Sequence, residues 1–418
     1  MNLLERAVAN EFSKSGESKK ISISGKINNI YDVYSIPIEL LYYNDQNGRI
    51  NTTYMKYKSE NGSLEPEKGD SEYNKIFERF IYDSNSQALI DTISSIKAKT
   101  QQEPAVVLPD GRVIDGNRRF TALRMIQNEI NIPQTLNAII IPLDANSKVD
   151  EKKIKELELD LQLGKEERVN YDPIDRIFDV YKTIVIDEMM TKEEYKKASG
   201  AKTTRGIKKD LRLAELIIKF IEIVSPGGDP IDKFYIAREL KLDGPIQEIE
   251  GVLTKLVSSD KESITQAVLT HLAVSKTDPN QQDSTRVMRD VKNHILKNED
   301  NLKYYLDAVD DKLDIIIDSF QECPIKSAND IKVLVSRDDD LSGSVEKLIN
   351  STNRIIYKGM KDNVRREGLL ELEGIRESLE EIQISDFDEL TDDEFIDAKS
   401  VLSEINDILF RLKQDLKI

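Results

Sequence analysis

The spacing of apolar residues along the chain changes near residue 148. Before this point short apolar runs alternate with turn residues, and beyond it apolar residues recur at helical spacing. The alternation Ile21-Ser22-Ile23-Ser24 predicts a half-buried strand, and the apolar positions between Ser86 and Lys97 predict a helix. The pattern therefore predicts an α+β N-terminal domain followed by mostly α-helical middle and C-terminal domains.

The best-defined local signal lies between residues 105 and 142. Two apolar runs, Ala105–Leu108 and Arg112–Ile114, flank Pro109-Asp110-Gly111 and predict a β-hairpin. A helix is predicted from Arg118 to Glu129, and a last buried strand from Ala138 to Pro142. Less regular segments are also expected: an arm or short helix over residues 1–20, a loop over 44–49 and a surface insertion over 60–70.

Capping residues mark helix boundaries in the second half of the chain. Asp172 before Pro173 predicts a helix that runs to Ile184. Thr191 and Glu194 form a capping box for the next helix, which Gly200 ends. Further features follow: a helix over Arg205–Val224, a break over Ser225–Pro230, and loops near Asp278-Pro279-Asn280 and at Ser342-Gly343.

These patterns predict an arm over residues 1–20 and domains over residues 21–148, 149–245 and 246–418. The net charge of −17 is unevenly spread, because residues 246–418 hold 23 Lys and Arg against 37 Asp and Glu, a net of −14. An acidic surface repels phosphate backbones, so a nucleic-acid contact is expected only in the first two domains. The bulk charge argues against a sequence-independent coat on nucleic acid.

Several protein classes are excluded by composition. No segment approaches the ~20 apolar residues that a membrane helix requires, and Met1–Arg6 lacks the layout of a secretory signal. The single cysteine, Cys323, cannot form an intrachain disulfide, and no cluster of Cys and His offers a zinc site. A cytoplasmic location without membrane contact is the simplest expectation.

The run Asp115-Gly116-Asn117-Arg118-Arg119 joins the predicted hairpin to the helix that follows. Two arginines in a first helical turn add positive charge where the helix dipole is already positive, which is unfavourable unless an anion neutralises it. Helix N-termini bind phosphate through backbone N–H groups, arginine adds bidentate contacts, and glycine lets the backbone approach a ligand. The alternative is that the arginines pair with nearby carboxylates such as Asp115 and Asp110.

This run resembles the Gly-x-x-Arg-x-x-Ala signature of the ParB N-terminal domain, in the ParB/sulfiredoxin-like superfamily. Gly116, Arg118, Arg119 and Ala122 match the family pattern, and Asn117 replaces its usual glutamate. The surrounding order is similar too: a loop with Asn44, Asn47 and Arg49, a helix over residues 86–97, and a strand that begins at Pro104. The likeness covers about residues 21–144.

The resemblance implies a domain that binds a nucleoside triphosphate, ATP or CTP, with Mg²⁺. Residues implied to contact the phosphates are Gly116, Asn117, Arg118, Arg119 and Thr121, with Asn47 and Arg49 from the first loop. Asp115 and Glu39 are the candidate catalytic carboxylates: Asp115 for orienting magnesium or an arginine, and Glu39 as a base. The simpler interpretation of Asp115 is a turn residue.

The chain departs from the superfamily pattern in two places. Sulfiredoxins carry a reactive cysteine before a His-Arg pair, and neither is present here, so sulfiredoxin chemistry is excluded. ParB proteins carry a second motif, Glu-Asn-x-x-Arg, and its best counterpart here, Leu159–Leu163, lacks both the glutamate and the arginine. Lys165 or Arg168 could substitute, but the identity of the nucleotide stays open.

The middle domain resembles a ParB helix-turn-helix, with a helix after Thr191, a turn at Gly200 and a second helix. Candidate contacts to double-stranded DNA gather at the start of the second helix: Lys202, Thr203, Thr204, Arg205, Lys208 and Lys209. A solvated helical hairpin is the alternative, because electrostatic affinity for DNA needs several aligned cations.

The expected function is a nucleotide-binding protein that hydrolyses ATP or CTP and acts on or with DNA, with nuclease activity as an alternative. The resemblance implies a role in DNA partition or in anti-phage defence linked to DNA modification. Alternatives are a phosphotransferase that uses Glu39 or Asp115 as base, and a non-catalytic adaptor switched by nucleotide. His271 and His294 are expected at the surface or hydrogen-bonded. The helices from Ile355 to Ile418 are expected to pack on the body, or to pair with a second copy or another protein.

Overall fold

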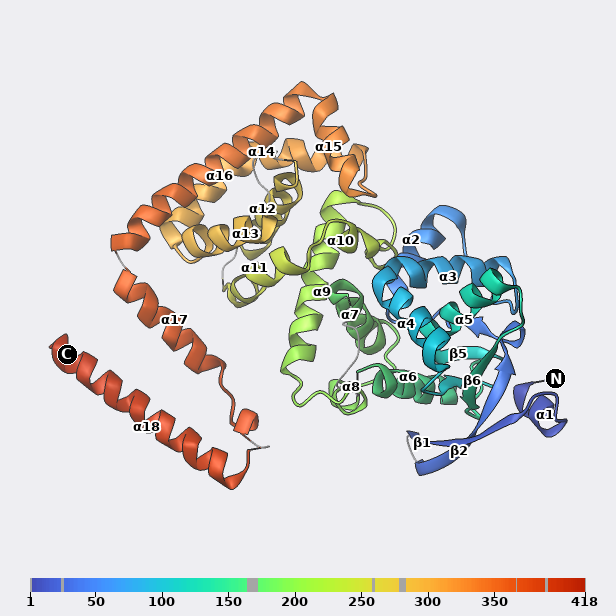
Figure 1. Ribbon diagram of the computed structural model, residues 1–418. Coiled ribbons are helices and arrows are strands. Elements are labelled where there is room, and N and C mark those ends of the chain that lie inside the picture. Colours follow the sequence, from blue (N-terminus) through green and yellow to red (C-terminus); the bar gives the residue numbers. More distant parts are fainter. Residues whose placement is uncertain are drawn as a thin grey trace. The chain divides into compact units, whose positions relative to one another are not determined.

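The computed structural model describes residues 2–23, 26–163, 172–257, 260–277, 283–365, 367–387 and 390–417. These residues form two compact units, Met1–Tyr357 and Lys358–Ile418. The first unit begins with a sheet and its covering helices, coloured blue to blue-green in Figure 1, and continues as a longer helical part, coloured green to orange.

Strands of the described residues build one mixed sheet near the N-terminus. They are β1 (Lys14–Ile23), β2 (Lys26–Pro37), β3 (Tyr42–Tyr43), β4 (Ala105–Val107), β5 (Arg112–Asp115) and β6 (Thr135–Ile140). Their order in the sheet is β1-β2-β6-β4-β5-β3. β6 pairs antiparallel with β2 and parallel with β4, while β5 pairs antiparallel with β4 and parallel with β3. The predicted hairpin of β4 and β5 is therefore confirmed.

Helices cover both faces of this sheet. They are α1 (Leu3–Val8), α2 (Asn51–Asn61), α3 (Glu72–Ser84), α4 (Ser86–Lys99), α5 (Asn117–Ile130) and α6 (Lys148–Leu163), with a 3₁₀ turn, η1 (Ile38–Leu40). Val107 packs in one core with Phe77 and Phe120, whereas its neighbour Val106 packs in a second core with Leu157 of α6. Successive side chains of a strand point to opposite faces, so a strand covered on both faces becomes a continuous apolar run.

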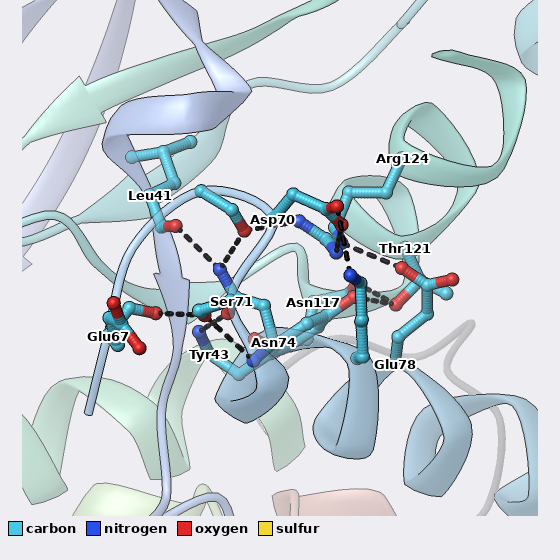
Figure 2. Close-up of polar contacts among 12 residues, drawn as sticks. Leu41, Tyr43, Glu67, Asp70, Ser71, Asn74, Glu78, Asn117, Thr121 and Arg124 are labelled. Carbon is cyan, nitrogen blue, oxygen red and sulfur yellow. Dashed lines mark hydrogen bonds and ion pairs between the residues drawn. The ribbon is translucent and has the colours of Figure 1, made fainter. Parts of the chain in front are cut away.

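Polar side chains anchor the surface insertion between α2 and α3 (Figure 2). Asn74 Nδ2 donates to the carbonyls of Leu41 at 3.1 Å and Gly69 at 2.8 Å. Arg124 Nη1 donates to the same Gly69 carbonyl at 2.8 Å, and its Nε lies 2.7 Å from Glu78 Oε2. Because Arg124 lies on α5, the insertion is tied to the helix that begins within the Gly-Asn-Arg-Arg run.

The rest of the first unit is helical. Its elements are α7 (Pro173–Tyr181), η2 (Lys182–Ile186), α8 (Lys192–Ser199), α9 (Arg205–Val224), η3 (Pro230–Lys233), α10 (Tyr235–Glu239), α11 (Asp243–Lys255), α12 (Lys261–Ser275), α13 (Ser284–Val291), η4 (Lys292–Leu296), α14 (Glu299–Glu322), α15 (Ala328–Arg337) and the part of α16 (Asp339–Arg365) that ends at Tyr357. The apolar stripe of α9 packs against α7, α11, α12 and α14. The predicted fold class is confirmed: a mixed α+β region followed by a largely helical remainder.

Two local predictions are wrong. The first strand begins at Lys14, inside the segment expected to be an arm or short helix, because it pairs with β2 in an antiparallel ribbon. Ser342 and Gly343, predicted as a loop, lie inside α16. Burial of Leu341 and Val345 on either side of this glycine offsets its helix cost of about 1 kcal/mol. The predicted loop near residues 278–280 lies outside the described residues.

His271 also differs from expectation. Its side chain is fully buried in α12, and within the described part of the chain neither ring nitrogen has a hydrogen-bond partner. Burial lowers the pKa of this imidazole to about 4, so the side chain is neutral at physiological pH. Sequence spacing could not show this, because α12 is buried on nearly every side rather than along one stripe.

The second unit contains the C-terminal helices α17 (Glu367–Glu381) and α18 (Asp392–Asp415), with the 3₁₀ turn η5 (Ile384–Phe387) between them. No residue of α18 is buried, and Leu372, Ile375 and Ile382 are exposed. The side chains of Leu369 and Leu370 lie outside the described ones. Pairing of these helices with a second copy stays a prediction.

A buried carboxylate links the α+β region to the helical part of the first unit. Asp175 of α7 is fully buried and accepts hydrogen bonds from Thr52 of α2, at 3.2 Å from the backbone N and 2.5 Å from Oγ1. Arg238 Nη1 lies 3.2 Å from Asp175 Oδ2. Burial is the largest influence and raises the pKa of Asp175 to about 6.

A carboxyl whose pKa is raised by folding stabilises the fold most when it is protonated. The unfolding free energy should therefore fall as pH rises from about 4 through about 6, by an amount on the order of 2–3 kcal/mol from this one group. Urea unfolding across this range checks it, with Asp175→Asn as the comparison. As pH rises to about 6–7, the unfolding free energy of the wild type should fall relative to that of Asp175→Asn. At higher pH the difference between the two proteins should stay constant. A constant difference over the whole range contradicts the prediction.

Candidate phosphate-binding cavity

A cavity of about 500 Å³ opens beside the start of α5. Its walls come from the loop before α2, from α3 and α4, from residues 100–103, from the β5–α5 junction and from the end of α6. The lining residues are Asn47, Arg49, Ile81, Ser84, Asp91, Thr92, Ser95, Ile96, Thr100, Gln101, Gln102, Glu103, Asp115, Gly116, Asn117, Arg118, Arg119 and Gln162. All five residues of the predicted Asp-Gly-Asn-Arg-Arg run are therefore at this cavity, together with Asn47 and Arg49.

Gly116 is the residue that lets β5 turn directly into α5. It is the N-cap of the helix, with a left-handed backbone at φ 98°, and no side chain caps the first turn. A Cβ at this position would lie 2.7 Å from the Ala105 Cβ, so only glycine fits both the conformation and the contact. The first residues of α5 line the cavity, and no side chain caps the N–H groups of this turn, which favours an anion there.

The two arginines of the run have different surroundings. Arg119 Nη2 lies 3.1 Å from Asp115 Oδ2, and its Nη1 donates to the Glu103 carbonyl. Local pairing, the alternative considered for both arginines, is therefore correct for Arg119. Asp110 pairs instead with Arg112, outside the run.

Arg118 has no carboxylate partner among the described residues. Burial lowers the pKa of its guanidinium, and the positive charges of Arg49 and Arg119 lower it further. A half-buried cation that faces two other cations has an unfavourable energy until a counter-ion arrives. This cluster, beside the start of a helix, is suited to an anion with several oxygens, such as a phosphate chain.

Asn117 adds a different chemical feature to the same wall. The residue is only 6% exposed, and within the described residues its Oδ1 has no hydrogen-bond partner. Asn117 Oδ1 cannot bond to an ionised phosphate oxygen, because both atoms only accept hydrogen bonds. A donor can bond to it instead: a water, a hydroxyl group or a hydrated cation that accompanies the phosphates.

The first loop holds its own shape through two asparagines. Asn44 Oδ1 accepts from the Gln46 N–H at 3.1 Å, and Asn47 Oδ1 accepts from the Arg49 N–H at 3.1 Å. Both asparagines are buried. The oxygen of Asn47 is therefore used to shape the turn that presents Arg49 to the cavity.

Two predicted site residues lie elsewhere. Thr121 is fully buried, lies 2.8 Å from the Tyr43 hydroxyl and donates to the Asn117 carbonyl at 3.0 Å, so it holds α5 in place rather than lining the cavity. Glu39 is exposed in η1 and is not among the lining residues.

Part of the cavity wall could not be predicted. Asp91 and Ser95 are one helical turn apart on α4, and the sequence shows only a polar helix face there. Glu158 was not predicted either. It does not line the cavity, but its Oε1 accepts a hydrogen bond at 3.1 Å from the N–H of Gly48, which lies between two lining residues. Its spacing from Lys155 and Gln162, three and four residues, places all three on one face of α6 and was an available signal.

The candidate DNA contacts lie between α8 and the start of α9. Gly200 ends α8 in a left-handed conformation, as predicted, and Thr191 and Glu194 form the predicted capping box. Lys202, Arg205 and Lys208 are exposed, while Thr203, Thr204 and Lys209 are partly buried. The opposite face of α9 buries Ile207 and Leu211, so the cations share the solvent side of the helix start.

Within the described residues, no group of three or more His, Cys, Asp or Glu side chains could hold a metal ion. A magnesium ion bound by phosphates needs only one or two carboxylates, and Asp91, Glu103 and Asp115 line the cavity. The residues present thus fit a cation that arrives with a nucleotide.

The described residues include no helix that combines the length and apolar character needed to cross a membrane. Lys165 and Arg168, the suggested substitutes in the second motif, lie outside the described residues.

Comparisons with known proteins add one similarity. No family model and no curated protein matches the chain. A solved structure described as "Structure of the C2221 form of Pnob8-like ParB-N domain" is similar over 63% of this chain and 94% of that one, with 13% sequence identity and a TM-score of 0.29. The description of this structure has the same family name as the resemblance found in the sequence.

Proposed function

We propose that the chain binds a nucleoside triphosphate in this cavity, with the phosphates at the N-terminus of α5. The observation that supports it most is the half-buried Arg118, which faces Arg49 and Arg119 beside an uncapped helix start. A triphosphate supplies negative oxygens for Arg118, which has no carboxylate partner among the described residues.

Hydrolysis of the bound nucleotide is the finer proposal. Magnesium bound with the triphosphate would offset its charge. Arg118 and Arg49 would stabilise the negative charge that develops on the phosphate oxygens as the bond between the γ-phosphate and the nucleoside diphosphate breaks. A carboxylate must also orient the attacking water. Asp115 pairs through one oxygen with Arg119, so Asp91 and Glu103 are the other candidates at the cavity.

The positions of the carboxylates help to distinguish a hydrolase from a phosphotransferase. A phosphotransferase with Glu39 as base gains no support, since Glu39 is exposed and is not a lining residue. Release of phosphate without an acceptor substrate would favour a hydrolase, and binding without any turnover would favour a nucleotide-switched adaptor.

Thermal unfolding with inorganic tripolyphosphate and with the magnesium complexes of ATP, CTP, GTP and UTP tests the proposed function. A ligand at one hundred times its dissociation constant stabilises the fold by about 2.7 kcal/mol. Stabilisation by tripolyphosphate and by a nucleotide supports a phosphate site. No stabilisation by any of them at millimolar concentration contradicts it.

We also propose that the exposed cations at the start of α9 bind double-stranded DNA. Replacing Lys202, Arg205 and Lys208 together by glutamate should abolish binding at 100 mM salt. Milder single replacements by alanine should each reduce the slope of log K against log salt by about 0.9 for each DNA phosphate that is no longer neutralised. A fluorescence anisotropy titration with duplex DNA measures both effects.

A matched control variant has the same change in net charge elsewhere. Lys303, Lys332 and Lys347 are exposed on α14, α15 and α16, and replacing all three by glutamate should leave DNA affinity close to that of the wild type. Equal losses in the two triple variants would show a general charge effect and would contradict a local DNA site.

A further inference from the structure

A buried series of polar contacts connects the cavity wall to α8. The Gly48 N–H donates to Glu158 Oε1 at 3.1 Å, and Gln162 Nε2 donates to the same oxygen at 3.1 Å. Gly48 lies between the lining residues Asn47 and Arg49, and Gln162 lines the cavity itself. Glu158 therefore holds two parts of the wall at once.

Lys155 continues the series away from the cavity. Its Nζ lies 3.4 Å from Glu158 Oε2 and 2.5 Å from Asp179 Oδ1 of α7. Tyr195 of α8 donates its hydroxyl to Asp179 Oδ2 at 3.2 Å. The contacts thus run from the loop of Arg49 through α6 and α7 to the first helix of the helix-turn-helix-like pair.

Breaking any one of these contacts costs more free energy than it would at the surface, because the groups are buried. Glu158, Asp179 and Tyr195 are each no more than 3% exposed. Two carboxylates share one ammonium group, and burial raises the pKa of Glu158 against the opposing influence of Lys155. A buried charge that loses its partner has no water to replace it, so a shift at one contact must be accommodated at the others.

We propose that Glu158 is a positioning residue for the loop that carries Arg49, and that Lys155, Asp179 and Tyr195 link this loop energetically to α8. Nucleotide in the cavity and the ordered position of α8 then stabilise each other, because such coupling is reciprocal. The inference rests on the proposed nucleotide site but concerns residues that do not touch the ligand.

Hydrogen–deuterium exchange tests the link on the full chain, with and without whichever of magnesium ATP and magnesium CTP binds. In the wild type, nucleotide should slow exchange at residues 44–50, at 117–120 and in α8. In Tyr195→Phe, saturating nucleotide should still protect the two cavity segments, but the added protection in α8 should disappear. Nucleotide affinity should fall about fivefold, the lower end of usual coupling. Asp179→Asn should act in the same direction.

Tyr305→Phe is the matched control, because it also removes a buried hydroxyl, one that donates to the Ala267 carbonyl at 3.3 Å. It should keep the wild-type pattern of protection. Protection of the cavity without any change in α8 of the wild type would overturn the link and leave the proposed function standing. So would unaltered α8 protection in Tyr195→Phe. Absence of protection at the cavity itself would overturn both.

Discussion

Replacing Arg118 by alanine should weaken nucleotide binding at least about 10- to 100-fold, the worth of one or two hydrogen bonds to a charged group. The same variant should be as stable as the wild type or more so when no ligand is present. Arg118 carries a desolvation cost and faces Arg49 and Arg119, without a carboxylate partner among the described residues. Removing it therefore relieves repulsion in the free protein and removes attraction in the complex.

Calorimetric titration with the four magnesium nucleotides, together with urea unfolding, measures both effects. Arg118→Lys separates charge from geometry: lysine keeps the charge but cannot make a bidentate contact, so binding should be only partly restored. Arg79→Ala is the control, since Arg79 is an exposed arginine of α3 that pairs with Asp83 and does not line the cavity. Unchanged affinity in Arg118→Ala, or an equal loss in Arg79→Ala, would contradict the proposed phosphate site.

Replacing Gly116 by alanine should be among the most destabilising single changes in the N-terminal region. A left-handed backbone costs a residue with a Cβ roughly 1–2 kcal/mol, and overpacking adds about 1–3 kcal/mol. Both penalties apply here, because φ is 98° and the new Cβ would lie 2.7 Å from that of Ala105. We expect a loss of roughly 2–5 kcal/mol and a weakened phosphate site, since the start of α5 must shift away from β4.

Gly251→Ala is the same glycine-to-alanine change at another position, and it is expected to stabilise the protein. Gly251 is exposed inside α11, and a Cβ there would meet nothing within 4 Å. Alanine should stabilise this helix by about 0.5–1 kcal/mol. Urea unfolding of the two variants measures the contrast. A loss of less than about 1 kcal/mol in Gly116→Ala would show that the turn relaxes easily and would contradict this account of the glycine.

Local elements with a chemical marker were predicted well. Asp172 caps α7, Thr191 and Glu194 cap α8, and Gly200 ends it as expected. These signals depend on hydrogen bonds between residues a few positions apart, so the local sequence is enough to predict where each helix begins or ends. Ser342 and Gly343 show the limit: Leu341 and Val345 beside them are buried by tertiary packing, which the local sequence does not show, and this keeps the pair inside α16.

The sequence by itself determined the α+β region followed by helices, and the helix start at which Gly116, Asn117, Arg118 and Arg119 stand together. Only the tertiary structure decided that Arg119 is paired while Arg118 faces other cations, and that Thr121 and Glu39 stay out of the cavity. It also brought Asp91 and Gln162 to this cavity. The reason is physical: a helix boundary depends on adjacent residues, whereas a cavity depends on how segments more than a hundred positions apart pack against one sheet.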